Sequence, residues 1–552
     1  MDERVEAAVD YISLLPEHIL HHILSFLPIK QIAKTSALSK TWCQAWNAFQ
    51  ILEFDFNAIF SGNRNLYRYP DLENNRQKLY DTVEQILLRR RRQMITLTKF
   101  TVIVPAVYQR PEVVSTMDRW ICHALGSHVK DLKIAVGPSG NEEEYSYSLP
   151  QPVFNAISIQ VLDLDNCKLK LHPGGDIKLP SLKKLSLTTV FADDIVVSKL
   201  LAGCPLIEDL NFIWCFGFKT LQILDHHANL LKLRVEWLEH LEQIKLEAHN
   251  LRSLELHGPS WPSRLEVVSL KNLTSLIISK APITDKWLNE QLNKFAHLEN
   301  LDLFSCPMLT SIKIWSSHIH TLHISSCKEL ARIEIDTPNL SIFSYSGDII
   351  SFSSNDLILS EVMLCLESKI MDVSWYIRWI EFLDKFNQHC KVLNWKLTSG
   401  TGKSFLIPKE IRQILSPPLC KVKELKLSIS NQDESFTTAE LVDAMLWISP
   451  HLQSLRIYSS LKSFFKFSYK QPTNEGESGC YKSLPVSCWN HCMEEVNIKQ
   501  ISYAVIPTWH YYTEDVQMKP ISNHEERSYI LKQDIWEKIE SGLLDWAPEC
   551  LI

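Results

Sequence analysis

The sequence has little glycine, no long apolar run and only a small excess of charge. Glycine accounts for 15 of the 552 residues, which argues against an enzyme built on glycine hinges. No apolar stretch approaches the roughly 18 residues of a membrane-spanning helix, and the acidic, polar residues 1–10 lack the pattern of a signal peptide. A net charge of −7 is mild at this length, so we expect neither nucleic acid nor a membrane surface as the general partner.

The cysteines are sparse for so long a chain. The 14 cysteines lie singly, unlike those of a small disulfide scaffold, and indicate reduced thiols in a cytoplasmic or nuclear protein. Hydrophobic residues make up 45% and charged residues 22% of the sequence, as in soluble folded proteins. Because 552 residues are too many for one compact core, we expect two or more domains or an elongated repeat.

Residues 11–55 predict three short helices. Pro16 suits the first position of a helix, with Ser13 as its cap, and Pro28 ends that helix. A second helix begins near Ile29, and a third surrounds Trp42. The first helix carries an apolar stripe that consists of Ile19, Leu20, Ile23, Leu24 and Leu27.

This small module has more apolar residues than its interior can bury, since Leu14, Leu15 and Pro16 lie outside the stripe. Such an excess indicates a surface that binds a partner. A helical cap that packs on the following domain would show the same excess. The residues alone leave both interpretations open.

The spacing of residues 12–42 closely resembles the plant-type F-box. The resemblance rests on Ile12-Ser13-x-Leu15-Pro16-Glu17-x-Ile19-Leu20, Ile23-Leu24-Ser25-Phe26-Leu27 and Leu38-Ser39-Lys40-x-Trp42. It implies binding to a Skp-type adaptor and, through it, to a cullin and a RING subunit. It also implies that Trp42 holds the helices together, whereas His21 and His22 occupy variable positions and receive no role. Carried over to this sequence, the adaptor surface consists of Leu14, Leu15, Pro16, Ile19, Leu20, Ile23, Leu24 and Leu27.

A pattern of the form L-x-x-L-x-L recurs through the middle of the chain. Its copies end at residues 164, 187, 212, 235, 256, 278, 303, 324 and 345, in steps of 21 to 25 residues. This period is typical of leucine-rich repeats, whose units bury their apolar faces by stacking on one another. A cysteine follows three residues after several copies, and we expect these buried thiols to be structural: Cys167, Cys215, Cys306 and Cys327.

A second pattern at half the period indicates strands on the convex side of the repeats. Ile312 and Ile314, and again Ile333 and Ile335, fall midway between the main strands and alternate with polar residues. We therefore expect strands on both faces from about 240 to 345. Residues 193–203, in contrast, predict a short convex helix.

The outward positions of the main strands are the candidate recognition surface. They are polar and aromatic with no dominant sign of charge, as suits a protein epitope, although each could also be merely a solvated strand position. The positions are Lys184, Ser186, Thr188, Asp209, Asn211, Glu255, His257, Asn300, Asp302, Phe304, Thr321, His323 and Ser325.

The repeat pattern changes after Gly347. A helix is predicted at about 371–388, and strands at 392–397, 422–427 and 452–457 surround a second helix at about 437–448. Residues 488–498 resemble the start of the FBD region that follows many plant F-box repeats. Residues 502–509 depart from that pattern, so a diverged FBD-like end is expected.

No motif predicts a catalytic, metal or cofactor site. Residues 400–404 resemble part of a phosphate-binding loop, but Leu397 stands where the loop needs its first glycine. Cys480, Cys488, His491 and Cys492 lack the paired spacing of a zinc site. Residues 89–92, four adjacent arginines, are interpreted as a solvated basic face between the F-box and the repeats.

We therefore expect an α/β fold in which a three-helix F-box precedes a leucine-rich-repeat solenoid, or horseshoe, with strands on its concave face and helices and strands on its convex face. The expected parts are an F-box at 8–55, a linker helix and first repeats at 56–135, leucine-rich repeats at 136–345, longer irregular units at 346–460 and an FBD-like region at 461–552.

This organisation, together with the resemblance, implies a non-catalytic substrate-recognition subunit of an SCF-type ubiquitin ligase that tethers an unidentified protein target. Two alternatives remain. The chain could be a Skp-bound scaffold without a role in degradation, or a hormone-type receptor that binds a small molecule on its repeats. The second would need a deep pocket lined by clustered basic residues, which the predicted concave positions do not contain.

Overall fold

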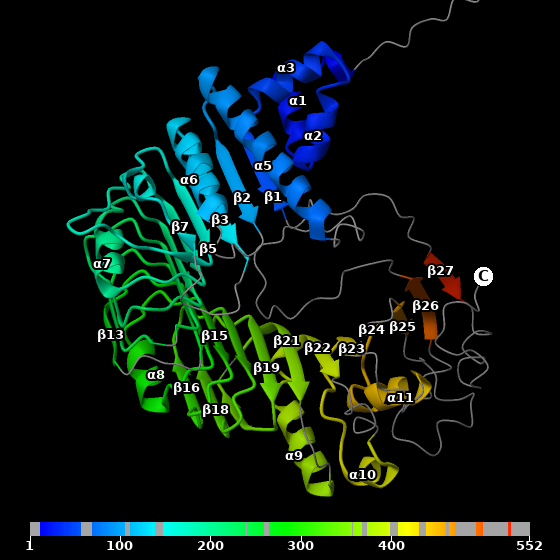
Figure 1. The fold of residues 1–552 in the computed structure, drawn as a ribbon. Coiled ribbons are helices and arrows are strands. Elements are labelled where there is room, and N and C mark those ends of the chain that lie inside the picture. Colours follow the sequence, from blue (N-terminus) through cyan, green and yellow to red (C-terminus); the bar gives the residue numbers. More distant parts are fainter. Residues whose placement is uncertain are drawn as a thin grey trace, which may run out of the picture. The chain divides into compact units, whose positions relative to one another are not determined.

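The computed structural model describes residues 12–56, 69–104, 111–137, 147–238, 240–258, 264–355, 357–366, 372–397, 407–429, 438–459, 463–469, 493–500 and 528–531. The chain divides into two compact units, Met1–Leu273 and Thr274–Ile552. Each is described by itself below, and Figure 1 shows the order of their elements.

The first unit begins with the three-helix module, which we define as residues 12–49. A short 3-10 turn precedes three α-helices: η1 (Ile12–Leu14), α1 (Glu17–Leu24), α2 (Ile29–Thr35) and α3 (Lys40–Ala48). The three helices are confirmed, but the predicted cap is wrong. Pro16 precedes α1 instead of starting it, no side chain caps α1, and Ser13 lies in the 3-10 turn. Ser39 does cap α3, because its hydroxyl accepts from the amide of Trp42 at 3.3 Å.

The module continues directly into a parallel sheet. The chain passes from α3 to the first strand within three residues, so the sheet starts inside the segment predicted as the F-box. The strands of unit 1 pair in the order β1 (Ile51–Asp55), β2 (Lys99–Val104), β3 (Asp131–Val136), β5 (Val161–Asp165), β7 (Lys184–Thr188), β8 (Asp209–Ile213), β10 (Lys232–Glu236) and β12 (Ser253–His257).

Helices and short strands cover the other side of each repeat in unit 1. They are α5 (Tyr69–Arg92), α6 (Pro111–Gly126), β4 (Tyr147–Ser148), η2 (Gln151–Asn155), β6 (Cys167–Lys168), α7 (Asp194–Ala202), β9 (Thr220–Ile223), β11 (Gln243–Glu247) and β13 (Arg264–Ser269). The convex helix predicted at 193–203 is confirmed as α7, which Asp193 caps by accepting from the amide of Val196 at 2.8 Å.

The second unit repeats this arrangement with longer segments. Its main strands are β14 (Ser275–Ser279), β15 (Asn300–Phe304), β17 (Thr321–Ser325), β19 (Ile342–Gly347), β21 (Leu359–Leu366), β22 (Cys390–Leu397), β23 (Glu424–Ile429) and β24 (Ser454–Ser459), all parallel. Three antiparallel strands follow: β25 (Ser463–Tyr469), β26 (Met493–Gln500) and β27 (Ser528–Leu531). The rest of the predicted FBD-like region, including residues 488–492, lies outside the described residues.

The covering elements of unit 2 correct one expectation. They are α8 (Asp285–Leu292), β16 (Ser311–Trp315), β18 (Arg332–Asp336), β20 (Ser351–Ser354), α9 (Val373–Asp384), α10 (Lys409–Ile414) and α11 (Thr438–Ile448). Second-face strands are confirmed at β11, β13, β16 and β18, and the helices predicted near 371–388 and 437–448 as α9 and α11. An unbroken series of such strands from 240 to 345 is wrong, because Thr284 caps a helix, α8, that buries Leu288.

The repeats of unit 1 share a core, built by the alternation of buried and outward residues along each strand. The in-register leucines Leu162, Leu185, Leu210, Leu233 and Leu254 are each at most 2% exposed. Burying one such side chain contributes roughly 1.5–3 kcal/mol, and each does so against the repeats on both sides. The stack therefore stabilises every unit through its neighbours.

The main strands end in a shared backbone turn. The residue after the strand is left-handed, with φ between 50° and 56°, in seven repeats: Asn166, Thr189, Trp214, Trp237, Lys280, Ser305 and Ser326. The predicted structural cysteines follow directly after four of them. Cys167, Cys215, Cys306 and Cys327 are all buried, as expected.

Arg90, on α5, joins the three-helix module to the repeats. Its guanidinium donates to the backbone carbonyls of Trp46 (2.7 Å), Asn47 (3.2 Å) and Phe49, and lies 4.7 Å from the centre of the Trp46 ring. These carbonyls end α3, where the helix lacks internal donors and carries partial negative charge. The Phe49 amide also donates to the Trp46 carbonyl, at 3.3 Å, so Arg90 adds a second donor there and supplies donors to the Asn47 and Phe49 carbonyls.

The four arginines at 89–92 do not share one environment. Arg90 is only 3% exposed, so the interpretation of this run as a solvated face is wrong for it. Burial, and to a lesser extent Arg89, lowers the pKa of Arg90 to about 10, which leaves it charged at neutral pH. Arg89, Arg91 and Arg92 are exposed, as expected.

The described helices include none long and apolar enough to cross a bilayer. Among the same residues, no group of three or more His, Cys, Asp or Glu side chains could hold a metal ion.

Replacing Arg90 by methionine should loosen the three-helix module. The substitution keeps a long apolar stem but removes the side-chain donor from the Asn47 and Phe49 carbonyls, and a buried acceptor left without its donor costs about 1–3 kcal/mol. Hydrogen exchange of α3 should report an opening free energy lower by about 2–5 kcal/mol. The exposed Arg92→Met control should stay within about 0.5 kcal/mol of the parent. Equal exchange in Arg90→Met and Arg92→Met would show that Arg90 does not hold the module.

Candidate functional site

The three-helix module has a compact interior made by all three helices. Leu20 and Leu24 of α1 pack with Ile32, Trp42, Ala45 and Phe49, and each of these six is at most 5% exposed. The structural role of Trp42 is therefore confirmed. His21, to which no role was given, also contributes: its Nε2 lies 3.0 Å from the Ala45 carbonyl, and its ring contacts Phe49 edge-on.

The predicted adaptor residues divide into a buried and an accessible group. Leu20 and Leu24 face the interior because they occupy the side of α1 that packs on α3, so the structure removes them from the accessible surface. Leu15, Ile23 and Leu27 are half-buried and pack against the core from outside. Ile19 is also half-buried. Leu14 is 72% exposed, and Pro16 beside it is exposed as well.

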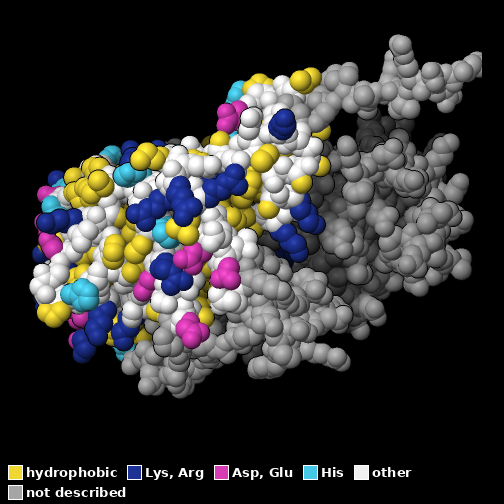
Figure 2. Space-filling model, turned by 45° about the horizontal axis from the view of Figure 1, so that its top comes forward, with side chains coloured by type: hydrophobic (Ala, Val, Ile, Leu, Met, Phe, Trp, Pro, Cys, Tyr) yellow, Lys and Arg dark blue, Asp and Glu magenta, His cyan; other side chains and the backbone are white. Residues whose placement is uncertain are grey.

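Three further apolar residues are exposed on the same module and were not predicted as contact residues. They are Ile12 (54%), Phe26 (57%) and Leu38 (68%). Phe26 and Leu38 follow the helices α1 and α2, outside the apolar stripe that guided the prediction. Figure 2 shows hydrophobic side chains on the module where it comes forward at the top of the view. So much exposed apolar surface on some 40 residues favours a protein partner.

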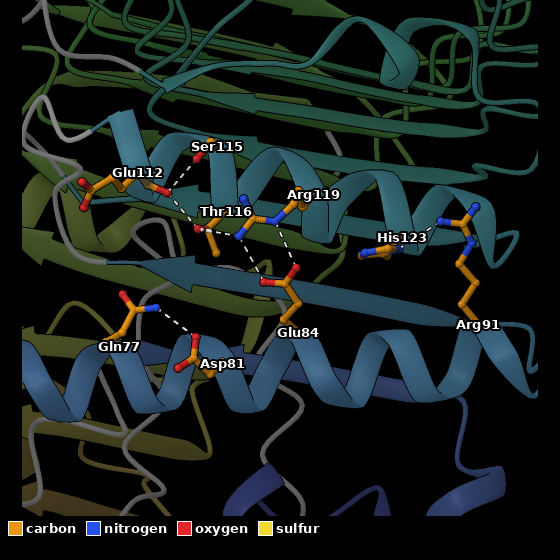
Figure 3. Close-up of polar contacts among 9 residues, drawn as sticks. All are labelled: Gln77, Asp81, Glu84, Arg91, Glu112, Ser115, Thr116, Arg119 and His123. Carbon is orange, nitrogen blue, oxygen red and sulfur yellow. Dashed lines mark hydrogen bonds and ion pairs between the residues drawn. The ribbon is translucent and has the colours of Figure 1, made fainter.

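Polar contacts join α5 and α6, the two long helices of unit 1. Figure 3 shows Arg119 of α6 reaching across to Glu84 of α5, with nitrogen–oxygen distances of 3.0 and 3.1 Å. The hydrogen bond with Arg119 holds the pKa of Glu84 below its usual value. Nearer the C-terminal end of α5, Arg91 lies 3.2 Å from the ring of His123. These contacts brace the helix that carries Arg90.

The second candidate surface is the open face of each main sheet, defined as the outward side chains of its strands. In unit 1 the strand register places Lys184 beside Asp209, at 3.2 Å, and Ser186 beside Asn211. Glu255 lies two strands from Asn211. Burial opposes its ionisation, but a hydrogen bond with His257 and the charge of Arg234 keep the pKa of Glu255 below its usual value.

In unit 2 the register pairs the predicted residues directly. Asn300 lies beside Thr321, Asp302 beside His323 and Phe304 beside Ser325. Burial lowers the pKa of His323, which favours its neutral form. The predictions are wrong for His257 and Ser325, which are only 7% and 5% exposed and are therefore buried. The other predicted positions, Thr188 among them, are exposed or half-buried.

Several outward residues of unit 1 were missed by the sequence analysis. Lys133 and Asp163 pair at 2.7 Å, and Arg234 bridges Glu236 at 2.6 Å and Glu255 at 3.7 Å. They come from repeat copies with a weak leucine pattern. The alternation that identified Lys184 and Ser186 would have found them, had it been extended to these copies.

Two tryptophans were missed as well. Trp214 and Trp237 follow β8 and β10 at the left-handed turn, and their rings stack 4.7 Å apart at an angle of 4°. Trp214 is 46% exposed. No leucine periodicity marks these positions, although a bulky aromatic side chain after two successive strands was a readable signal.

The sequence is similar to known families over most of these elements. It matches the model of the At1g61320/AtMIF1 LRR domain over residues 88–262 and 251–378, which together cover more than half of the chain. It matches the F-box domain model over residues 12–54.

Similar proteins come from Arabidopsis thaliana. F-box/LRR-repeat protein At3g03360 is 26% identical over 59% of this chain and 63% of its own length. F-box protein At5g03100 is 28% identical over 56% of this chain and 83% of its own length. F-box/FBD/LRR-repeat protein At4g26340 is 32% identical over 37% of this chain and 43% of its own length. The chain thus spans less than two thirds of the first and third of these relatives.

The buried cysteines should resist alkylation in the folded protein. Burial raises the pKa of Cys204 and Cys215 to about 12, so about 10⁻⁴ of either thiol is ionised at pH 8. Iodoacetamide at pH 8 should therefore modify the exposed Cys122 and spare Cys204 and Cys215 until denaturant is added, as peptide mass spectrometry would show. Alkylation of Cys215 at the rate of Cys122 would contradict the structural assignment.

Proposed function

Because the chain belongs to the plant F-box/leucine-rich-repeat family, we propose that it is the substrate-recognition subunit of an SCF-type ubiquitin ligase. In this proposal it carries out no chemistry of its own. The three-helix module binds a Skp-type adaptor and, through it, a cullin and a RING subunit, while the open face of the repeats binds a protein target. The ten cysteines that are free thiols in the described part of the chain suit a cytoplasmic or nuclear site of action.

The observation that carries this proposal is the accessible apolar group on the three-helix module. Leu14, Phe26 and Leu38 are each more than half exposed although the module has an interior that could shelter apolar residues. We assign the adaptor contact to this group together with Ile12, Leu15, Pro16, Ile19, Ile23 and Leu27. Leu20 and Leu24 support it from beneath.

The junction supports the mechanism, because a tethering subunit works by raising effective concentration. Tethering makes ubiquitin transfer intramolecular, and the gain is largest when the connection holds the target at a suitable distance. Here Arg90 fixes α3 to α5, and β1 continues from α3 into the sheet. A target held on unit 1 would therefore keep a defined position relative to the adaptor.

The hormone-receptor alternative has less support. Such a receptor would need unpaired cations around a pocket, whereas four of the five Lys and Arg residues in the rows of the open face of unit 1 pair with carboxylates: Lys99, Lys133, Lys184 and Arg234. The scaffold alternative differs from the ligase only in its partners. It predicts capture of the adaptor without cullin.

Replacing Leu14 by aspartate should abolish adaptor binding. A charge at a buried interface anchor costs at least about 2 kcal/mol, or roughly 30-fold in affinity. Capture of tagged chain co-expressed with a plant Skp-type adaptor and cullin should yield both partners with the parent and neither with Leu14→Asp.

The matched control is Ile195→Asp on α7, since Ile195 is 68% exposed but lies outside the module. It should capture both partners like the parent. Undiminished adaptor capture by Leu14→Asp would refute the assigned surface, and adaptor without cullin on the parent chain would favour the scaffold.

A further inference from the structure

The Trp214–Trp237 pair stands at an unusual place in the backbone. Both residues have φ near +54°, a conformation that side chains with a Cβ adopt at a cost of roughly 1–2 kcal/mol. Their amides bind the neighbouring repeat, from Trp214 to the Glu236 carbonyl at 2.8 Å and from Trp237 to the His257 carbonyl at 2.7 Å.

The fold does not require tryptophan at this turn. The same position holds Asn166 and Thr189 in the preceding repeats and Gly258 in the following one. Asparagine and glycine adopt the left-handed conformation more readily than tryptophan. Two bulky residues kept in a costly conformation, with Trp214 46% exposed, indicate a role in binding.

The open face of unit 1 becomes more negative toward the Trp214–Trp237 pair. Alternate residues of β1 to β12, opposite in direction to the core leucines, form three rows across the strands, and Thr101, Ala135 and His257 among them are buried. The first row, from Ile51 to Ser253, contains three lysines and two aspartates, and the middle row, from Glu53 to Glu255, contains three carboxylates and two cations. These two rows balance each other.

The third row, directly before the left-handed turn, is acidic. Its eight positions are all described and include neither Lys nor Arg: Asp55, Ile103, Ala135, Asp165, Thr188, Ile213, Glu236 and His257. The excess negative charge of the open face of unit 1 therefore lies in the row next to the tryptophans.

Carboxylates of the acidic row lie on both sides of the pair. Glu236 directly precedes Trp237, and Asp165 ends β5, two strands before the strand that Trp214 follows. Burial and the charge of Asp163 raise the pKa of Asp165. Arg234 lies 2.6 Å from Glu236 and 3.7 Å from Glu255, and His257 and Lys232 also favour the ionised form of Glu255. The excess of negative charge therefore belongs to the third row as a whole, and a cation bound beside Glu236 would reduce it.

We propose that Trp214 and Trp237, together with Glu236 beside them in the acidic row, form a subsite for a lysine or arginine side chain of the target protein. The flat aromatic surface offers a cation–π contact and the acidic row supplies the complementary charge. The same repeats already use this contact, since the Lys168 ammonium lies 4.6 Å from the centre of the Phe191 ring. This inference rests on the proposed function, because it names the chemistry of the target that the ligase would recognise.

The test uses the full chain, purified through its own tag without the adaptor, and two fluorescein-labelled peptides measured by anisotropy. One is a dodecapeptide of repeated Gly-Ser-Arg, and the other is its citrulline copy, which keeps the shape of each arginine side chain and removes the charge. The arginine peptide should bind more tightly than the citrulline copy. Trp214→Ala should weaken arginine-peptide binding by about 2-fold to 30-fold, the range of a cation–π contact, and leave citrulline-peptide binding unchanged.

Matched variants separate this subsite from a general effect of folding or charge. Trp214→Phe, which keeps an aromatic face, should retain most of the affinity, and Glu236→Gln should lose part of it. Trp315→Ala removes a tryptophan that is 68% exposed on β16 and should bind like the parent. Circular dichroism and the thermal midpoint of each variant should match those of the parent.

The subsite fails if the citrulline copy binds as tightly as the arginine peptide, or if Trp214→Ala and Trp214→Phe both bind the arginine peptide like the parent. Adaptor capture is read separately: Trp214→Ala should capture the adaptor normally, and Leu14→Asp should bind the arginine peptide normally. Loss of adaptor capture by the parent chain would thus overturn the proposed function and leave the peptide result standing.

Discussion

The buried guanidinium of Arg90 is the contact on which the arrangement of unit 1 depends. A helix of nine residues such as α3 ends with carbonyls that have no donor within the helix, and a small module has few ways to supply one. Arg90 supplies donors from a different element, α5, and its ring contact with Trp46 fills the space around the charge. Helix α5 therefore supplies donors that the three-helix module lacks. The salt bridge between Glu84 and Arg119 in turn joins α5 to α6.

Much of the fold was predictable from the sequence because it depends on local periodicity. The positions of the main strands follow from leucines at a fixed spacing, and α7 and α9 follow from apolar residues at helical spacing. The cysteines after the strands were assigned correctly because their position within each repeat is constant. The family was identifiable for the same reason, since the F-box pattern spans many residues.

The errors arose where the outcome depends on contacts between distant residues. Nothing near Arg90 in the sequence distinguishes it from Arg89 or Arg92; only the folded position of α3 does. Leu20 and Leu24 belong to the same stripe as Ile19 and Ile23, and the side on which α3 packs decides which of them stay accessible. Alternation predicted His257 to face outward, but the side chain is buried in the folded chain. For the candidate recognition surface, alternation indicated which residues face outward, whereas the register of the strands was needed to reveal that the charge is sorted into rows.

The left-handed turn after each strand also has a consequence for how such proteins can diversify. The leucines before the turn and the cysteines after it must fit the core. The turn residue itself is exposed or half-buried, and its type ranges here from Ser305 to Trp214. Gene duplicates could therefore exchange residues at this turn, one repeat at a time, and acquire new binding preferences while the inherited scaffold persists.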